Sequence, residues 1–227
     1  LAETSAQHAA ALASAVPQSL QVKAMAHLVA AEAAQSLQDP AVRDLQVQAA
    51  LDVQLPKSAA HIHEGVHLRA ARWALDDRDP AAALSRLATL PQGTQRRTLA
   101  LRLKLRAARQ ARRNADALDT ARLLAKHGAF SATAAQSMVR SLATHTLTDA
   151  HDDQQLMRAW DSLTAAERAQ PEVATHAALR LVNVSANTPD ASAQQERARQ
   201  WLQTAWDSYP SLTDSAQSRL VQALEAT

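Results

Sequence analysis

The chain has 227 residues, a formal net charge of +2 and no cysteine. Without cysteine it can form neither a disulfide nor a thiolate metal site, and it has no thiol nucleophile. Aromatic residues make up only 3% of the chain, whereas Ala and Leu dominate its apolar fraction. Ala and Leu favour helices, while aromatic and β-branched residues favour strands, so the composition predicts an all-α fold.

The predicted helices follow the Pro, Gly and Asp residues along the chain. An Ala-rich helix over 3–16 comes first, and a last helix over 212–225 has no partner. Between them we expect five helical hairpins, at 19–37 with 40–55, 58–77 with 80–90, a helix from about 94 with 115–126, 131–148 with 152–163, and 171–185 with 191–209.

Two of these hairpins contain a repeat. HLVAAEAAQSLQDPAV, residues 27–42, and HLRAARWALDDRDPAA, residues 67–82, align without a gap, His27 with His67, and are identical at eight of sixteen positions. Each reads as a helix, a capping Asp, and a Pro at the first position of the next helix. A constant spacing of this size is typical of stacked helical hairpins. The sequence therefore predicts a right-handed α-solenoid of tetratricopeptide-like hairpins, and the absence of a long polar linker predicts one domain over 1–227.

The charge is concentrated in the centre of the chain. Residues 94–115 contain eight Lys or Arg and no acid. On a helix, Arg102, Arg106, Arg109 and Arg113 would form one stripe, which could bind an anion such as porphyrin propionates, acidic lipid head groups or an acidic partner peptide. Alternatively, acidic residues of neighbouring helices or water neutralise the stripe; the candidates are Asp76, Asp77 and Asp116. Aromatic residues for base stacking are scarce, so we do not expect nucleic acid binding.

The stretch His63-Glu64-Gly65-Val66-His67 spells H-E-x-x-H. In that motif two histidines bind zinc and the Glu activates water. A catalytic zinc needs a third protein ligand, but Ala70 and Trp73 occupy the positions of the extended motif. We expect a structural or solvated His pair, with haem iron or metal ligation by His63 and His67 as the alternative. The four Trp residues are expected in the core, although a porphyrin lying on Trp73 with His67 near the iron is a second interpretation.

Three stretches resemble a known family: LQVKAMAHLVAAEAAQSLQDPAVRDLQVQAAL, ALRLKLRAARQARRNADALDTARLLAKHGAFS and QQLMRAWDSLTAAERAQPEVATHAALRLV. They look like the HemY family of proteobacteria, over residues 21–209. The strongest local match is Trp160 with Leu163, Glu167-Arg168 and Pro171. The resemblance implies an inner-membrane protein with an N-terminal anchor and a tetratricopeptide-like domain, associated with late haem synthesis and without assigned catalytic residues. Since the chain begins with Leu1, we expect it to be a soluble fragment without that anchor.

The favoured hypothesis is a non-catalytic scaffold that holds partner proteins, among them enzymes of haem biosynthesis, beside the bacterial inner membrane. It needs no cofactor. A flavin-dependent oxidase is not expected, because the three glycines are isolated and form no dinucleotide fingerprint. The alternatives are direct haem or porphyrin binding through His63, His67 and the basic stripe, and a zinc hydrolase at the H-E-x-x-H stretch.

Overall fold

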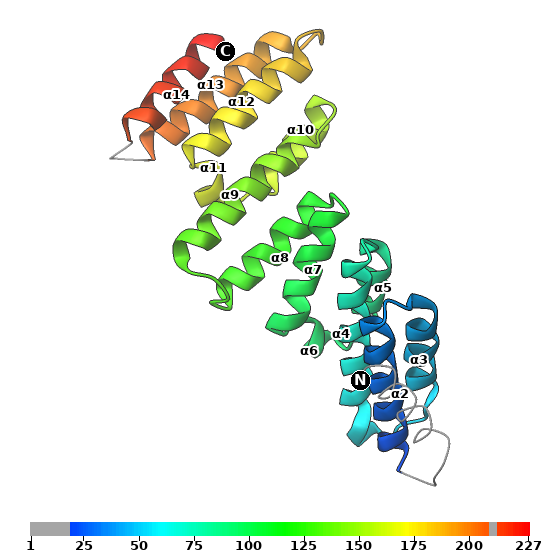
Figure 1. The fold of residues 1–227 in the computed structure, drawn as a ribbon. Helices are drawn as coiled ribbons and strands as arrows, with labels where there is room; N and C mark the ends of the chain where they lie inside the picture. Colours follow the sequence, from blue (N-terminus) through cyan, green and yellow to red (C-terminus); the bar gives the residue numbers. More distant parts are fainter. Residues whose placement is uncertain (1–18, 209–212) are drawn as a thin grey trace. The chain divides into compact units, whose positions relative to one another are not determined.

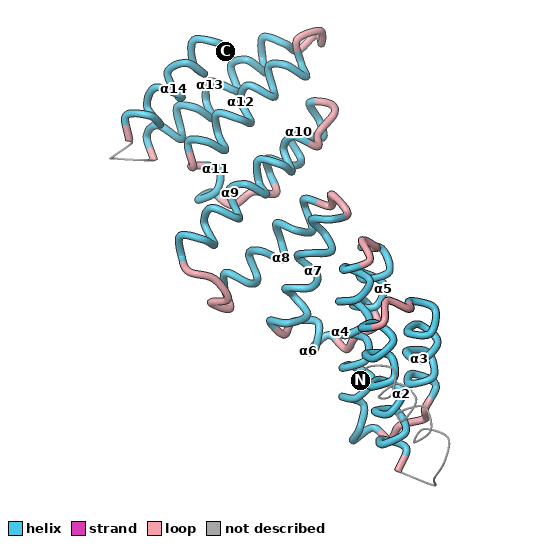
Figure 2. Tube along the Cα trace, viewed as in Figure 1, coloured by secondary structure: helices cyan, strands magenta, loops and turns pink. Residues whose placement is uncertain are grey.

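The computed structural model describes residues 19–208 and 213–227, and all regular structure in these ranges is helical (Figures 1 and 2). The prediction of an all-α fold is confirmed. The predicted helix 3–16 lies outside the described residues. In chain order the described helices are α2 (Leu20–Ser36), α3 (Pro40–Asp52), a 3-10 turn (Lys57–Ala59), α4 (Ala60–Asp76), α5 (Pro80–Ala88), α6 (Gln92–Gln95), α7 (Thr98–Gln110), α8 (Asn114–Lys126), α9 (Ala132–Thr148), α10 (Asp153–Asp161), α11 (Ala165–Arg168), α12 (Pro171–Ser185), α13 (Ala191–Asp207) and α14 (Asp214–Ala226).

The chain divides into two compact units, with the boundary between Ala111 and Arg112. In the first unit, α2 packs on α3 and α4 packs on α5, so each forms a helical hairpin, and α7 packs on α4 and α5. In the second unit, α8 packs on α9, and α12 packs on α9, α13 and α14. The single continuous domain stays a prediction.

The repeated Asp-Pro pair starts a helix in both hairpins of the first unit. The Asp39 carboxylate accepts a hydrogen bond from the backbone N–H of Val42 at 3.0 Å, and the Asp79 carboxylate accepts one from Ala82 at 2.9 Å. Each bond satisfies a backbone donor that the first turn of a helix leaves without a partner. The capping function that the sequence repeat predicts for these two residues is therefore confirmed.

Four turns between consecutive helices use the left-handed backbone region. Gln38, Arg78 and Arg112 have φ angles of 58°, 62° and 54°, and Gly128 has 65°. After Gln38 the N–H of Asp39 bonds to the carbonyl of Ala34 at 3.0 Å, and an equivalent bond follows each of Arg78 and Gly128. These bonds satisfy the last carbonyls of α2, α4 and α8.

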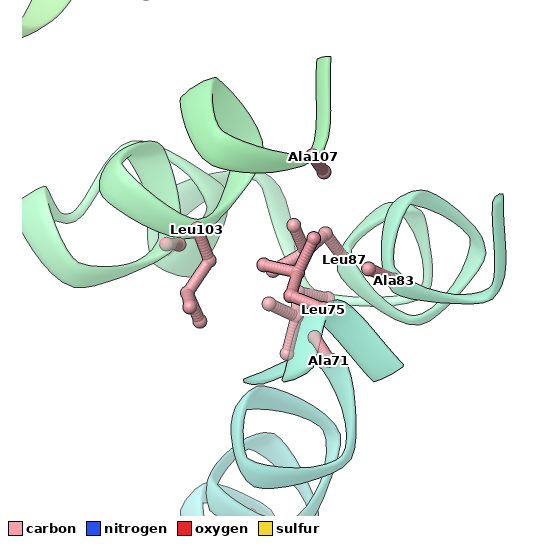
Figure 3. Close-up of a cluster of buried hydrophobic side chains, with 8 residues drawn as sticks. Ala71, Leu75, Ala83, Leu87, Leu103 and Ala107 are labelled. Atoms are coloured by element: carbon pink, nitrogen blue, oxygen red, sulfur yellow. The ribbon is translucent and has the colours of Figure 1, made fainter. Parts of the chain in front are cut away.

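The core of the first unit combines leucines with alanines. Figure 3 shows Leu75 and Ala71 of α4 packed with Ala83 and Leu87 of α5 and with α7. The small alanines let the helices approach closely, and the leucines fill the space between them. Because α7 contributes Ala100, Leu103 and Ala107 to this cluster, its orientation in the first unit is fixed by apolar contacts.

A partly buried ion pair and a stacked aromatic pair connect helices of the second unit. Arg122 of α8 contacts Glu167 of α11 twice, through Nε at 2.9 Å and through Nη2 at 2.5 Å. Trp160 of α10 stacks on Trp201 of α13 with ring centroids 4.2 Å apart. Trp160 is 5% exposed and Trp73 is 7% exposed, so the expectation of core positions is confirmed for these two tryptophans.

Several helix boundaries differ from the prediction. The short helices α6 and α11 fall where connections are expected, and α3 ends at Asp52 rather than near residue 55. Over the described residues, no helix combines the length and the apolar character that a membrane crossing requires.

Candidate functional site

The exposed side of α7 carries the basic residues that the sequence singles out. Its Leu and Ala residues at 100, 101, 103, 105, 107 and 108 are buried. At 100° per residue, Arg102, Arg106 and Arg109 fall within about 60° of one another, on a side of α7 that faces away from these positions. We call these three residues the α7 arginine face. An exposed apolar residue, Leu99, adjoins this face; it is 58% exposed and lies one turn before Arg102.

Arg113 does not belong to this face. The prediction that four arginines share one helical stripe is wrong at this residue, because α7 ends at Gln110 and Arg112 turns the chain with a φ of 54°. Arg113 is the residue before α8, in the second unit, and its Nε lies 2.6 Å from a carboxylate oxygen of Asp116. Asp116 thus pairs with one arginine of the predicted stripe. Such pairing is the alternative to anion binding.

Arg106 also has an internal partner. Its Nη2 lies 2.9 Å from Asp76 Oδ1 and donates to the carbonyl of Leu75 at 3.3 Å. Gln110 donates to the same carbonyl at 3.3 Å. Since Leu75 and Asp76 end α4, Arg106 and Gln110 satisfy a C-terminal carbonyl and place positive charge at the negative end of that helix. Asp77, the third acidic candidate, pairs instead with the buried Arg43 at 2.6 Å.

Arg102 and Arg109 are exposed, as is Arg106, and their side chains are suited to an external ligand. A guanidinium presents a planar set of donors that matches a carboxylate or a phosphate. Residues 94–115 contain no acid, so within α7 itself no acidic side chain competes for these guanidinium groups. The adjoining Leu99 adds apolar area, which a protein partner can bury and a small inorganic anion cannot.

The second candidate is the His63–His67 stretch in α4, where Glu64 has a structural partner. Thr94 donates its hydroxyl to Glu64 Oε2 at 2.7 Å, and Arg97 Nη1 lies 3.8 Å from the same oxygen. Thr94 is 3% exposed, so this bond ties α4 to the turn at α6 in the interior. A metalloprotease requires this Glu to activate a metal-bound water, whereas here its carboxylate holds two parts of the chain together. Nothing in the local sequence indicates Thr94 as a partner, because it belongs to a different helix.

The two imidazoles have different surroundings. His63 Nε2 is buried and has no hydrogen-bond partner among the described residues. His67 Nδ1 lies 3.3 Å from the hydroxyl of Thr89 on α5. Burial lowers the pKa of His67 below its usual value, and the electrostatic interactions with Arg86 and His63 add to this effect. Because His67 is therefore neutral at pH 7, it is in the protonation state that binds a metal or haem iron.

No third ligand accompanies them in the described ranges 19–208 and 213–227, where no three His, Asp or Glu side chains are grouped to hold a metal ion. Trp73, the candidate surface for a porphyrin, is buried against Ala31, Val47 and Ala50 of the first hairpin. It presents no open ring face. His27, the repeat equivalent of His67, binds Gln46 of α3 at 2.8 Å, which is a structural function.

The residues that carry the family resemblance are packing residues. Trp160, Leu163, Glu167 and Pro171 are all buried. Such residues report how helices pack and carry little information about chemistry. No family model, curated protein or solved structure matches this chain, so the function is argued from its own residues.

Proposed function

We propose that this protein is a non-catalytic scaffold, a right-handed solenoid of tetratricopeptide-like hairpins that binds an acidic segment of a partner protein on the α7 arginine face. The observation that carries the proposal is the placement of Arg102 and Arg109 on the same exposed side of α7 as Leu99, on a helix whose other side is buried. Charged side chains steer the partner and set its orientation, while the apolar contact supplies most of the affinity.

The resemblance to HemY supports a cellular setting for this scaffold. It would lie beside the bacterial inner membrane, held by an anchor outside these residues, and its partners would include enzymes of late haem synthesis. Arrays of helical hairpins bind extended partners more often than they catalyse reactions, which is why we favour a scaffold over an enzyme. This setting rests on the resemblance alone.

The test compares two charge reversals that change the net charge equally. Arg102→Glu with Arg109→Glu alters the α7 arginine face, and Arg199→Glu with Arg219→Glu alters exposed arginines of the second unit. Each protein is purified from membranes with its bound partners, which are identified by mass spectrometry. We expect the first variant to capture at least about ten-fold less partner, since each hydrogen bond to a charged group contributes about 1.5–3 kcal/mol. Equal capture by both variants would remove the α7 arginine face from the proposal.

A second function, direct haem or porphyrin binding, is favoured by one observation, the neutral His67 beside the partnerless His63 Nε2. In this case the imidazole would bind the iron, and the arginines would pair with the propionates. Titration with haemin should give a saturable Soret shift that is lost in His63→Ala and His67→Ala and kept in His61→Ala, whose side chain is exposed. A scaffold without haem affinity gives no saturable shift.

A zinc hydrolase at His63, Glu64 and His67 is the third alternative. Metal analysis of protein purified without added metal tests it directly. One zinc per chain that disappears in His63→Ala would favour this alternative. In that case Glu64 would have to leave Thr94 to serve a metal-bound water.

A further inference from the structure

The first hairpin, α2 with α3 (Figure 1), has a pocket at the end where α2 begins and α3 ends. Its volume is about 400 Å³, and sites for small molecules usually measure about 300–1,000 Å³. The lining residues are Leu20, Lys23 and His27 of α2, Ala49 and Asp52 of α3, and Val53 and Gln54. The three residues of α2 are spaced three and four apart and therefore lie on one side of that helix. We call this cavity the α2–α3 pocket.

The α2–α3 pocket contains one charge of each sign. Lys23 has no hydrogen-bond or ion-pair partner among the described residues. Asp52 accepts a hydrogen bond at Oδ1 from Gln48 Nε2 at 2.8 Å, which leaves Oδ2 as an acceptor. Lys23 lies near the start of α2 and Asp52 is the last residue of α3, so each charge has the same sign as its own helix end. Both charges are therefore unfavourably placed within the hairpin, and a ligand with the opposite charges relieves both.

His27 adds a second acceptor to the pocket. Its Nδ1 lies 2.8 Å from the side-chain oxygen of Gln46, which can only accept, so Nδ1 carries a proton. In the neutral imidazole Nε2 then remains an acceptor. Leu20, Ala49 and Val53 supply an apolar wall. The pocket thus combines one cationic donor, two acceptors and an apolar surface.

The sequence repeat shows how the second hairpin fills the corresponding position. In the alignment of the two copies, Gln54 corresponds to Thr94. Thr94 is 3% exposed and donates to Glu64 of α4, because the chain after α5 folds back as α6. α3 has 13 residues where α5 has 9, and it leaves Gln54 exposed. The first hairpin therefore keeps open a position that the second hairpin closes with its own chain.

We propose that the α2–α3 pocket binds a small zwitterion with an apolar side chain, of the class of a free amino acid such as leucine. The carboxylate of the ligand pairs with Lys23, its ammonium group with Asp52 and His27, and its side chain lies on the apolar wall. A simple anion would leave Asp52 without a cation, and a simple cation would leave Lys23 without an anion. The pocket shares no residue with the α7 arginine face, so this inference goes beyond the proposed partner binding.

Titration of the full chain with leucine, followed by NMR of the backbone amides, tests the proposal. We expect saturable shifts at the lining residues. N-acetylleucine lacks the ammonium group and leucinamide lacks the carboxylate, so each should bind at least about ten-fold more weakly than leucine. The absence of a saturable shift at the lining residues would overturn the proposal. Equal binding of leucine and either analogue would also overturn it, because the pocket would then recognise a single charge.

Two variants test which residue recognises which charge. Lys23→Met should weaken the binding of leucine at least about ten-fold and leave that of leucinamide unchanged, whereas Asp52→Asn should weaken leucine equally and leave N-acetylleucine unchanged. Both side chains are exposed, so the buried sides of α2 and α3 stay intact. Lys57→Met is the matched control, because Lys57 is an exposed lysine of the same unit that does not line the pocket. Equal affinity of Lys23→Met and Lys57→Met for leucine would overturn the proposal.

Discussion

Gln38, Arg78 and Arg112 adopt a backbone conformation that L-residues rarely use. Their φ angles of 58°, 62° and 54° lie in the left-handed region, where a Cβ atom approaches the following carbonyl oxygen. Gly128 has the same conformation, with φ of 65°, without that cost. The shared conformation shows that the turn, rather than the side chain, determines the backbone at these positions.

Replacing Gln38 or Arg78 with glycine should therefore stabilise the protein. We expect Gln38→Gly and Arg78→Gly each to raise the free energy of unfolding by about 0.5–1 kcal/mol, the steric cost minus the added entropy of the unfolded chain. Urea denaturation measures the change. Ala111→Gly is the control, because Ala111 has φ of −79° and gains nothing from glycine. A loss of stability in the first two variants would show that their side chains make contacts worth more than the backbone cost.

His67 and His176 make the stability depend on pH. Burial is the main cause that lowers the pKa of each below 6.5. Electrostatic interactions with Arg86 and His63 add to it for His67, and those with Arg180 and His145 add to it for His176. The unfolded chain then binds protons more readily than the folded one. The contribution of these residues is therefore complete above the unfolded pKa and is lost as the pH falls through 6.5 towards the folded value.

The free energy of unfolding should accordingly decrease between about pH 7.5 and about pH 5.5. In the double variant His67→Gln with His176→Gln this decrease should be smaller, because the groups that take up protons on unfolding are gone. Urea denaturation at both pH values measures it. If the variant loses as much stability as the wild type, other groups cause the pH dependence.

At the scale of the helices, Arg106 of the α7 arginine face contributes to folding. Arg106 holds the end of α4 through Asp76 and Leu75. Arg106→Ala should lower the free energy of unfolding by about 1 kcal/mol, since it removes a hydrogen bond and a partly exposed ion pair. Arg109→Ala should change it by less than about 0.5 kcal/mol. Equal losses in the two variants would contradict this assignment.

The link between α8 and α11 depends on a largely buried carboxylate. Burial by itself raises the pKa of Glu167, but hydrogen bonds from Arg122 and Thr164 outweigh burial and lower the pKa below its usual value. Arg122→Ala would leave this carboxylate, 8% exposed, without its cation. We expect a loss of about 2 kcal/mol in the free energy of unfolding. Arg140→Ala is the matched control, because the pair of Arg140 with Glu172 is half-exposed on each side and should cost less than about 1 kcal/mol.

The sequence predicts helices well where proline and aspartate mark their ends. Pro40, Pro80 and Pro171 each begin a helix where one is expected. The four-residue helices α6 and α11 escape prediction because one turn is too short to show a hydrophobic period. The sequence does not indicate that the arginine stripe ends with α7, because Arg112 makes the left-handed turn without a glycine.

The candidate sites are harder to predict than the helices. The positions of Arg102, Arg106 and Arg109 on one face follow from the helical period alone. The partners of Glu64 and Arg106 do not, because the two members of each pair lie on different helices and meet only when the intervening hairpin folds back. This is why H-E-x-x-H, a local pattern, is a weaker guide to function than its surroundings.

At the scale of the whole molecule, the proposed function requires that a surface centred on Leu99, Arg102 and Arg109 binds a protein. A photo-crosslinking amino acid in place of the exposed Leu99 tests this most directly, with a second at the exposed Arg219 of α14 as the control. We predict that crosslinking in cells joins a distinct protein to position 99 and not to position 219, and that adding Arg102→Glu with Arg109→Glu abolishes this product. The same products at both positions, or a product at position 99 that persists after the charge reversal, would contradict the claim.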